Sequence, residues 1–395
     1  MDPAEREGLR PKGNVPNLRF PEFQGEWDKC KFRDVCSIST GNKNTQDKID
    51  DGIYPFYVRS QTVERINSWT FDGEAILTAG DGVGVGKVFH HTYGKIGVHQ
   101  RVYILSDFKC DANYLFHFFS SKFYNRVKRM SAKNSVDSVR KEMITDMPLS
   151  LPSHQEQVKI GYLLSLLDER IATQNKIIDK LQSLIKGLED NLLDNPLWEK
   201  TYLRSFMQFF STNSLSWEQL SYKEGAIRNL HYGLIHGFQT RGINSASLPM
   251  IKNEAIPKQY TLCQVGDVTF ADASEDTGEI AKSVEFVDTI EGDTICGLHT
   301  IHGRDIKNRT VVGFKGFAFN SRYFHNQIKR LAQGTKVFSI TANNLSSCYV
   351  YLPDLDTQTV IVRLLKSYEE QLIIDRMIFK QYEKQKQYLL RQMFI

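Results

Sequence analysis

The feature that most constrains this chain is a long pattern that occurs twice, 201 residues apart. Each copy opens with Leu-Pro, has a glutamine shortly after the proline (Gln157 and Gln358), and continues into a helical heptad. In such a heptad, apolar residues alternate at spacings of four and three, which places them along one seam of a helix. A polar residue interrupts both seams at the same heptad position, Gln174 in one copy and Asp375 in the other, and such a break suits control of register.

The two seams predict two long helices that form a coiled coil. The first helix is expected to run from about His154 to Leu193 and to stop before Asn195-Pro196, because proline disfavours helical geometry in the residue before it. The apolar seam of the first helix is Ile160, Leu164, Leu167, Ile171, Ile178, Leu181, Ile185, Leu188 and Leu192. The seam of the second helix is Ile361, Leu365, Tyr368, Leu372, Phe379, Tyr382, Leu389 and Met393, with Lys386 as a further departure from the apolar pattern.

Shorter matches extend the repeat upstream of the helices. Lys128 and Lys329 keep the offset of 201 residues, whereas Trp27 and Trp198 lie 171 residues apart. The second copy therefore carries about 30 extra residues between two matched ends. We predict a duplicated unit, an α/β (α+β) domain followed by a long helix, used twice. With the two helices antiparallel, the monomer gains an approximate internal two-fold axis.

The predicted organisation has five parts. Residues 1–26 form a leader whose first part is disordered or foreign to the natural protein. Residues 27–150 form the first globular domain, and residues 151–196 form the first spacer helix. Residues 197–351 form the second globular domain, and residues 352–395 form the second spacer helix.

Composition narrows the class of protein. The chain is 41% hydrophobic and 24% charged, which is ordinary for a soluble globular protein. Its apolar runs are too short for a transmembrane helix, and its start lacks the apolar region of a secretory signal. The six cysteines are scattered without a C-x-x-C pair, which favours a reducing cytosol. A net charge of +4 permits nucleic-acid binding without demonstrating it.

Familiar catalytic motifs are missing from the sequence. The glycine-rich stretch before Lys87 lacks the leading glycine and the Ser/Thr that a phosphate-binding loop requires. There is no G-x-S-x-G nucleophile elbow. Asn195-Pro196-Leu197 is not the motif of an adenine methyltransferase, and Pro353-Asp354 lacks the downstream lysine of a common nuclease core. We therefore expect no catalytic residues in this chain.

One segment offers candidate metal ligands. Cys296, His299 and His302 stand at three-residue spacing. A structural zinc site needs four ligands, and no fourth lies nearby in the sequence. We therefore favour a basic polar loop here and expect no metal.

Two loops are rich in groups that contact nucleic acid. The first is the glycine-rich stretch at residues 80–87, and the second is its counterpart at residues 272–282. Closely spaced glycines let a backbone approach another surface, and lysine, glutamine and arginine contact phosphates and base edges. Unpaired lysine and arginine are rarely buried, so we expect the side chains of Lys87, Arg101, Arg304 and Arg309 to be free, although ordinary surface turns with local salt bridges are the alternative. The candidates for DNA contact are Lys87, His99, Gln100, Arg101, Lys133, Lys282, Arg304, Lys307, Arg309 and Lys336.

Several stretches resemble the specificity subunits of type I restriction–modification enzymes. They are VPNLRFPEFQGEW at residues 15–27, ILTAGDGVGVGK at residues 76–87, LLDERI at residues 166–171, and the two Leu-Pro-x-x-x-x-Gln helix starts. The resemblance covers nearly the whole chain from Val15, and the tandem plan is its most specific element.

This resemblance implies a function and a set of partners. The two globular domains would be target-recognition domains, each reading half of a split double-stranded DNA sequence. The helices would act as a ruler and as the docking surface for two methyltransferase subunits, and restriction subunits that translocate DNA would join that core. The chain itself would be non-catalytic and bind no cofactor, with S-adenosylmethionine, ATP and Mg²⁺ on its partners in a prokaryotic cytoplasm.

The expected helix length agrees with a ruler. At 1.5 Å per residue, the first helix spans on the order of 50 Å from its first seam residue, or about 15 base pairs at roughly 3.4 Å per pair. The competing class is a non-catalytic coiled-coil scaffold whose domains bind proteins. An enzyme that acts alone is a second competitor, which the missing motifs disfavour.

Overall fold

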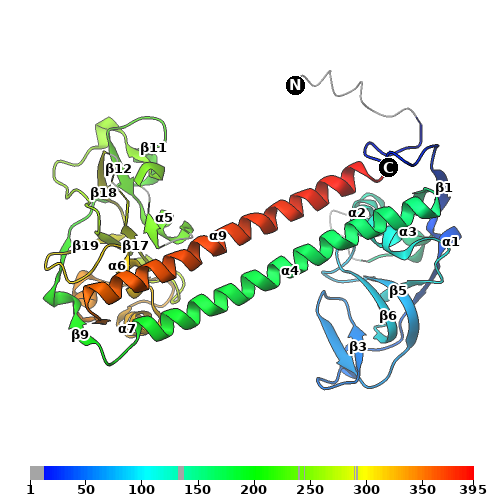
Figure 1. The fold of residues 1–395 in the computed structure, drawn as a ribbon, viewed down its shortest axis with the longest axis horizontal. Helices are drawn as coiled ribbons and strands as arrows, with labels where there is room; N and C mark the ends of the chain where they lie inside the picture. Colours follow the sequence, from blue (N-terminus) through cyan, green and yellow to red (C-terminus); the bar gives the residue numbers. More distant parts are fainter. Residues whose placement is uncertain (1–12, 132–137, 239–240, 244, 289, 291) are drawn as a thin grey trace. The chain divides into compact units, whose positions relative to one another are not determined.

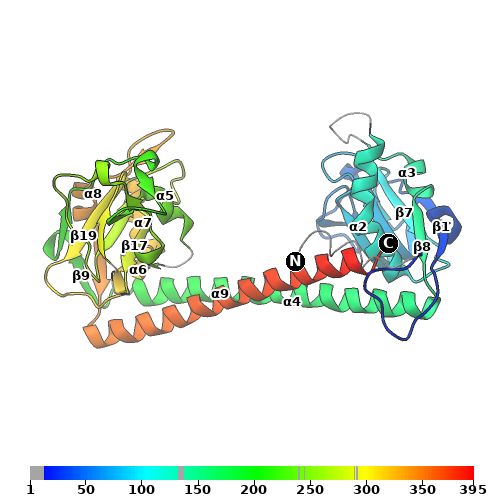
Figure 2. The same cartoon turned by 90° about the horizontal axis from the view of Figure 1, so that it is seen from above.

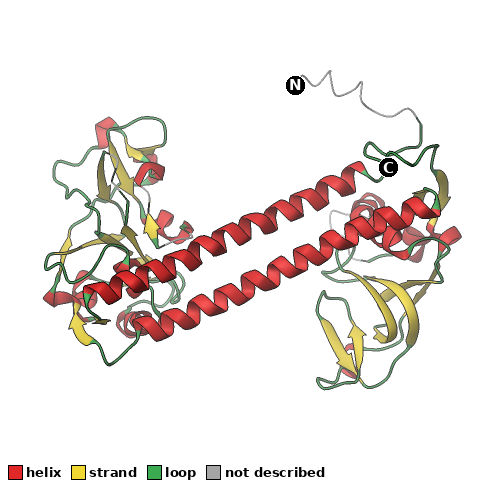
Figure 3. Ribbon diagram, viewed as in Figure 1, coloured by secondary structure: helices red, strands yellow, loops and turns green. Residues whose placement is uncertain are grey.

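In the computed structural model of this chain, residues 13–131, 138–238, 241–243, 245–288, 290 and 292–395 are described. The chain forms two compact units. Unit 1 comprises Met1–Asn175 and Ile378–Ile395, and unit 2 comprises Lys176–Met377. Each unit combines a mixed sheet with helices, as expected for an α+β fold (Figure 3).

The main sheet of unit 1 has the strand order β2-β7-β5-β6-β3-β4. Strands β5, β6 and β3 of this sheet are labelled in Figure 1. All neighbouring strands are antiparallel except β3 and β6, which are parallel. The strands are β2 (Ser37–Thr40), β3 (Tyr54–Tyr57), β4 (Val63–Ile66), β5 (Phe71–Ala79), β6 (Phe89–Val98) and β7 (Val102–Ser106). A separate ribbon pairs β1 (Asp28–Lys31) with β8 (Pro148–Leu151), so the two ends of this domain lie side by side.

The core of unit 1 lies between this sheet and the long helices. It joins Leu105 of the sheet, Phe119 of α2 (Ala112–Met130) and Leu164 of α4 (His154–Leu193) in one buried cluster. Figure 2 shows α2 and strand β7 of this domain. The α2 helix begins after Asp111, whose carboxylate accepts the Tyr114 N–H at 2.8 Å and so caps the first turn. The helices of this domain are α1 (Phe32–Val35), α2 (Ala112–Met130) and α3 (Lys141–Thr145).

Unit 2 repeats this plan. Its main sheet has the order β10-β19-β15-β17-β13, and only β13 and β17 are parallel neighbours. Order and direction therefore match β2-β7-β5-β6-β3 of unit 1 strand for strand. The strands are β10 (Met207–Phe210), β13 (Gly242–Ile243), β15 (Val268–Ala271), β17 (Ser283–Phe286) and β19 (Thr300–Asp305). The ribbon of β9 (Glu199–Tyr202) and β21 (Tyr349–Leu352) again joins the two ends of the domain.

Additions to this frame distinguish unit 2. A four-stranded sheet has the order β11-β14-β12-β18, and β16 pairs with β20. The added strands are β11 (Leu220–Ser221), β12 (Ile227–Leu230), β14 (Met250–Ile251), β16 (Ala273–Ser274), β18 (Asp293–Cys296) and β20 (Phe338–Ser339). The helices of this domain are α5 (Tyr232–Gly237), α6 (Phe314–Ala318), α7 (Arg322–Leu331) and α8 (Ala342–Ser347). The matched ends and divergent middle inferred from the sequence thus have a structural counterpart.

The two long helices are α4 (His154–Leu193) and α9 (Leu355–Gln392), and the first has the predicted bounds. Every seam residue on both helices is buried or half-buried. In unit 1, Ile160 near the start of α4 shares a core with Met393 after the end of α9. In unit 2, Leu192 near the end of α4 packs with Ile361 near the start of α9. Within each unit the helix segments therefore run antiparallel.

Lys386, which breaks the apolar seam of the second helix, has a specific partner. Its ammonium forms an ion pair with Asp168 of α4 in unit 1. The carboxylate offsets the cost of placing a lysine at a half-buried seam position.

The described part of the leader packs on unit 1. The Trp27 N–H donates to Asn14 O at 2.8 Å, and the Leu18 N–H donates to Gln392 O at 2.9 Å. Arg19 lies 2.8 Å from the buried carboxylate of Glu156. The expectation of disorder applied to residues 1–14, of which residues 1–12 lie outside the described residues.

One histidine of unit 1 is buried at the packing surface of α2. His117 of α2 lies with Nε2 3.2 Å from Ser165 Oγ and Nδ1 3.7 Å from an Asp168 oxygen. Burial, together with the nearby charge of Lys386, lowers the pKa of His117 to about 3. In the unfolded chain the His117 imidazole has a pKa of about 6.5. Between about pH 3 and pH 6.5 the unfolded state therefore binds a proton on His117 that the folded state does not bind.

We therefore predict that the contribution of neutral His117 to stability is complete above about pH 6.5 and is lost as pH falls toward the folded pKa. Denaturant unfolding measured across pH should show a loss of up to about 1.4 kcal/mol per pH unit from this group. His117→Gln should remove that component, whereas His154→Gln, at an exposed position, should retain it. Identical pH profiles for the wild type and His117→Gln would contradict the assignment.

Candidate nucleic-acid interface

The glycine-rich stretch of unit 1 forms the loop between β5 and β6. Gly82 and Gly86 have positive φ values of +77° and +66°, which glycine adopts without strain. A Cβ at Gly84 would lie 2.4 Å from the backbone oxygen of Arg59, so the loop lies directly against the chain segment after β3. Val83 at the tip is fully exposed. The glycines thus permit a close-packed base and a projecting tip.

Three cations lie at this loop, and two of them share one carboxylate. Asp81 Oδ1 is 2.9 Å from Arg59 Nη1, and Asp81 Oδ2 is 3.7 Å from Arg101 Nε. The side chains of Arg59 and Arg101 are 43% and 65% exposed, so both can reach a ligand. Lys87 is exposed, with its ammonium 5.2 Å from the centre of the Tyr124 ring. The loop therefore presents excess positive charge, as a phosphate-binding surface requires.

Arg59 was not among the candidates predicted from the sequence. Tyr57 O at the end of β3 accepts the His99 N–H, and Arg101 O accepts the Gly80 N–H at the start of the loop. These pairings bring Arg59 beside the loop, although 22 residues separate it from Asp81. No spacing pattern marks a contact of this kind, because the strand pairing that creates it is non-local.

The other unit 1 candidates differ in accessibility. His99 is buried, and its Nδ1 accepts the Arg101 N–H at 3.0 Å. Burial also lowers the pKa of His99, and this residue fixes the turn between β6 and β7; its contact with DNA stays a prediction. Gln100 is exposed and donates to Asn44 Oδ1 at 2.5 Å. Lys133 lies outside the described residues.

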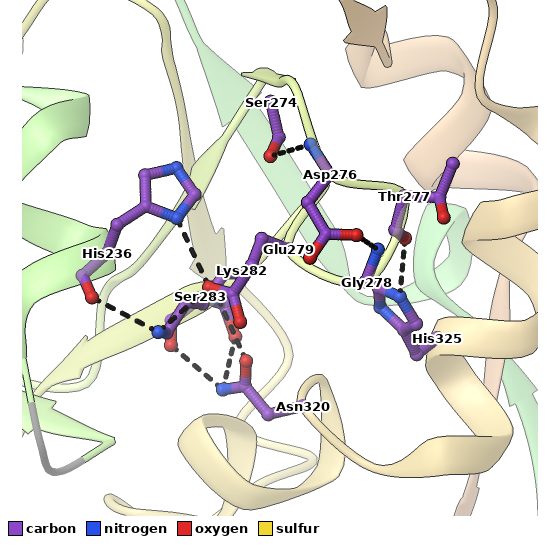
Figure 4. A network of polar contacts seen from close by, with 10 residues as sticks. All are labelled: His236, Ser274, Asp276, Thr277, Gly278, Glu279, Lys282, Ser283, Asn320 and His325. Atoms are coloured by element: carbon purple, nitrogen blue, oxygen red, sulfur yellow. Dashed lines mark hydrogen bonds and ion pairs between the residues drawn. The ribbon is translucent and has the colours of Figure 1, made fainter. Parts of the chain in front are cut away.

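The corresponding loop of unit 2, residues 272–282, is held by its own polar groups (Figure 4). Asp276 Oδ1 accepts the Gly278 N–H at 2.7 Å. The Lys282 ammonium lies 3.0 Å from Glu279 and 3.4 Å from the backbone oxygen of His236. Lys282 therefore stabilises the loop, and its contact with DNA stays a prediction.

Arg304 is also committed to the fold. Its Nε and Nη2 donate to the two oxygens of Asp267 at 2.8 and 2.7 Å, and Nη2 also donates to Leu262 O at 2.8 Å. Its guanidinium lies 5.1 Å from the centre of the Phe210 ring. The hydrogen bonds to Asp267 raise the pKa of Arg304. A buried carboxylate requires a paired charge, so the predicted freedom of Arg304 is wrong.

A second group of cations in unit 2 lines a cavity of about 560 Å³ next to the β9–β21 ribbon. Arg309 pairs with Glu199 at 2.6 Å. The other cations are Lys200, whose ammonium lies 3.9 Å from the centre of the Tyr349 ring, Arg204, and the exposed Lys307. Lys307 and Arg309 were predicted from the sequence, whereas Lys200 and Arg204 were not.

Two further observations complete the candidates of unit 2. Lys336 is exposed in the loop before β20. The segment around Cys296, His299 and His302, which was predicted as a basic polar loop, instead contains the end of strand β18 and the start of strand β19. Cys296 and His302 are buried in these strands, at 3% and 1% exposure. His299 alone stays at the exposed turn, with Nδ1 3.1 Å from Asp272.

Known proteins match this chain in sequence. Residues 24–183 match the family model described as the type I restriction modification DNA specificity domain. The chain is 26% identical over 168 residues to the specificity subunit of the type I restriction enzyme EcoDI from Escherichia coli, a match that spans 42% of this chain and 37% of that subunit. It is 25% identical over 405 residues to the specificity subunit of the type I restriction enzyme MjaVIII from Methanocaldococcus jannaschii, spanning 94% and 92%.

Solved structures share the fold. The S subunit of a type I restriction–modification system from M. genitalium superposes with a TM-score of 0.64 at 13% identity, over 96% of this chain and 99% of that one. A chain from a study of complex assembly and conformational transition in a type I system gives 0.53 at 12% identity, over 92% and 96%. Residues 24–183 therefore match a type I restriction modification DNA specificity domain, and the chain as a whole resembles the specificity subunits of type I restriction enzymes. Within the part of the chain that is described, every helix is too short or too polar to cross a bilayer.

If the unit 1 loop binds phosphates, Arg59→Ala, Lys87→Ala and Arg101→Ala should each weaken binding to all duplexes about equally. Each should also reduce the slope of log affinity against log salt by roughly one unit. Lys366→Ala, an exposed lysine on α9, is the matched control and should keep the wild-type slope. A loss confined to one base position would indicate base readout instead, and wild-type binding by all three variants would remove this loop from the interface.

Proposed function

We propose that each unit reads one half of a split double-stranded DNA site. The observation that supports this most directly is the repeated five-stranded sheet, identical in order and direction in the two units but carrying different additions. A common frame positions each reader in the same way, while different loops and added strands suit different base sequences. A symmetric dimer obtains two half-sites from two copies of a chain, whereas a duplicated chain can read two unlike halves.

In this proposal α4 and α9 set the separation of the half-sites and dock two methyltransferase subunits. Restriction subunits join through that complex. The chain is non-catalytic and binds no cofactor, with S-adenosylmethionine, ATP and Mg²⁺ held by the partner subunits. The exposed residues along both helices, such as Tyr162 and Tyr388, are candidates for that docking surface.

The test is to express the chain with methyltransferase subunits and map the methylated bases in the host genome. A split motif, with two short specific parts and a fixed gap, is the expected result. A random duplex library in a gel-shift assay then separates a DNA reader from a protein-binding scaffold. Absence of both methylation and duplex selection would favour the scaffold.

Exchange of residues 27–150 for the first domain of another specificity subunit should change one half-site and leave the other intact. The paired ends β1 and β8 make this possible, because the chain enters and leaves the domain through one ribbon. The reciprocal exchange of residues 197–351 is the matched control and should change only the other half. A chimera that alters both halves would show that readout is not independent.

Insertion of four residues after Lys180 adds about 6 Å to α4 and rotates the downstream part of the helix by about 40°. We expect the gap between half-sites to lengthen by one or two base pairs, with both half-sites retained. Lys180→Ala should leave the gap unchanged. If the insertion variant methylates with the original gap, the helices do not set the spacing.

A further inference from the structure

Two thiols and an imidazole meet in the interior of unit 2. Cys263, Cys296 and His302 are 7%, 3% and 1% exposed. One ligand atom from each lies within 4.8 Å of those of the other two, and the two sulfur atoms are 3.5 Å apart. All six cysteines of the chain are free thiols in the structure. Three ligand-type groups thus converge at one buried point.

The three residues come from different parts of the unit 2 fold. Cys296 ends β18 of the four-stranded sheet, and His302 lies on β19 of the five-stranded sheet. Cys263 is tied to β18 through its own N–H, which donates to Thr294 O at 2.8 Å. The cluster therefore joins the added sheet of unit 2 to the frame that both units share.

The sulfur separation fits a common ion. Tetrahedral zinc has Zn–S bonds of about 2.3 Å, which places two bound sulfurs roughly 3.8 Å apart. The observed 3.5 Å is close to that value and far from the ~2.0 Å of a disulfide. Two thiols and an imidazole form a soft donor set that suits zinc better than magnesium or calcium.

The surroundings of His302 resemble those of a metal-bound histidine. Its Nε2 lies 2.7 Å from Asp267 Oδ2, which leaves Nδ1 as the ring nitrogen available to an ion. Asp267 is itself oriented by Arg304 and by the Gln264 N–H at 2.8 Å. A carboxylate on the second nitrogen fixes the tautomer and orientation of a ligand histidine.

We propose that Cys263, Cys296 and His302 bind one zinc ion that fastens the four-stranded sheet of unit 2 to the five-stranded sheet. Binding forms two Zn–S bonds and one Zn–N bond and releases the two thiol protons to solvent. The buried Thr269 hydroxyl lies 2.9 Å from Cys296 Sγ and is the candidate for the fourth ligand that a structural zinc site needs. This site is independent of the function proposed above.

Unit 1 provides an internal contrast. His302 pairs with Thr269 between β19 and β15, and the matching pair between β7 and β5 is Tyr103 with Thr78. A tyrosine therefore stands where unit 2 has the ligand histidine. Among the described residues, this is the one cluster of metal-ligand type, and it accompanies the sheet that unit 2 has added.

The test measures metal in the full-length chain, purified without a metal-chelating tag. We expect about one zinc per chain by elemental analysis. Co²⁺ exchanged for zinc should give the thiolate charge-transfer band and the visible spectrum of a tetrahedral site. Cys263→Ser, Cys296→Ser and His302→Gln should each lose most of the metal. His299→Gln and Cys30→Ser should retain it, because His299 pairs with Asp272 and Cys30 lies in unit 1.

A second test uses the wild-type chain and does not depend on whether the ligand variants fold. A strong chelator added to the wild-type chain should remove the zinc and lower the unfolding temperature by several degrees, and added Zn²⁺ should restore it. The proposal is overturned if the folded wild type neither carries zinc nor takes up Co²⁺. It is equally overturned if alkylation without reductant shows Cys263 and Cys296 joined as a disulfide, or if His299→Gln abolishes metal binding.

Discussion

Two buried glutamine side chains join the long helices to their domains. Gln157 donates to Pro152 O at 2.7 Å and accepts the Asp111 N–H at 2.9 Å. Gln358 does the same with Pro353 O at 2.9 Å and the Val311 N–H at 3.0 Å. Loss of either amide would leave buried backbone groups unpaired, which costs on the order of 1–3 kcal/mol each. The orientation of each domain on its helix therefore depends on the hydrogen bonds of this glutamine.

The helices and the duplication could be predicted because their signals are local or periodic. Heptad spacing indicated the bounds of α4, and the offsets of 171 and 201 residues reappear in the ribbons, where Asp28 pairs with Leu151 and Glu199 with Leu352. The strand order of the two sheets could not be predicted, because pairing between distant strands leaves no periodic mark. The added sheet of unit 2 was visible only as an excess of residues.

In the candidate interface, too, some features could be predicted from the sequence and others could not. Composition identified cations, but whether each is free depends on partners far along the chain. Asp267 immobilises Arg304 from 37 residues away, and Arg59 reaches the glycine loop through strand pairing. The spaced Cys296, His299 and His302 contained two members of the buried cluster, while the third, Cys263, lies 33 residues upstream. The type of a side chain can be read from the sequence, whereas its contacts and burial depend on the fold.

Unit 1 is built from two segments that are far apart in the chain, with all of unit 2 encoded between them. Phe394 contacts Tyr114 and Phe118 of α2 at ring separations of 5.3 and 5.6 Å, and Met393 belongs to the same core. During translation, the early part of unit 1 therefore waits for more than 200 further residues before its core is complete. Until then the apolar seam of α4 near Ile160 stays exposed to solvent, and we expect chaperones to bind this surface of the nascent chain.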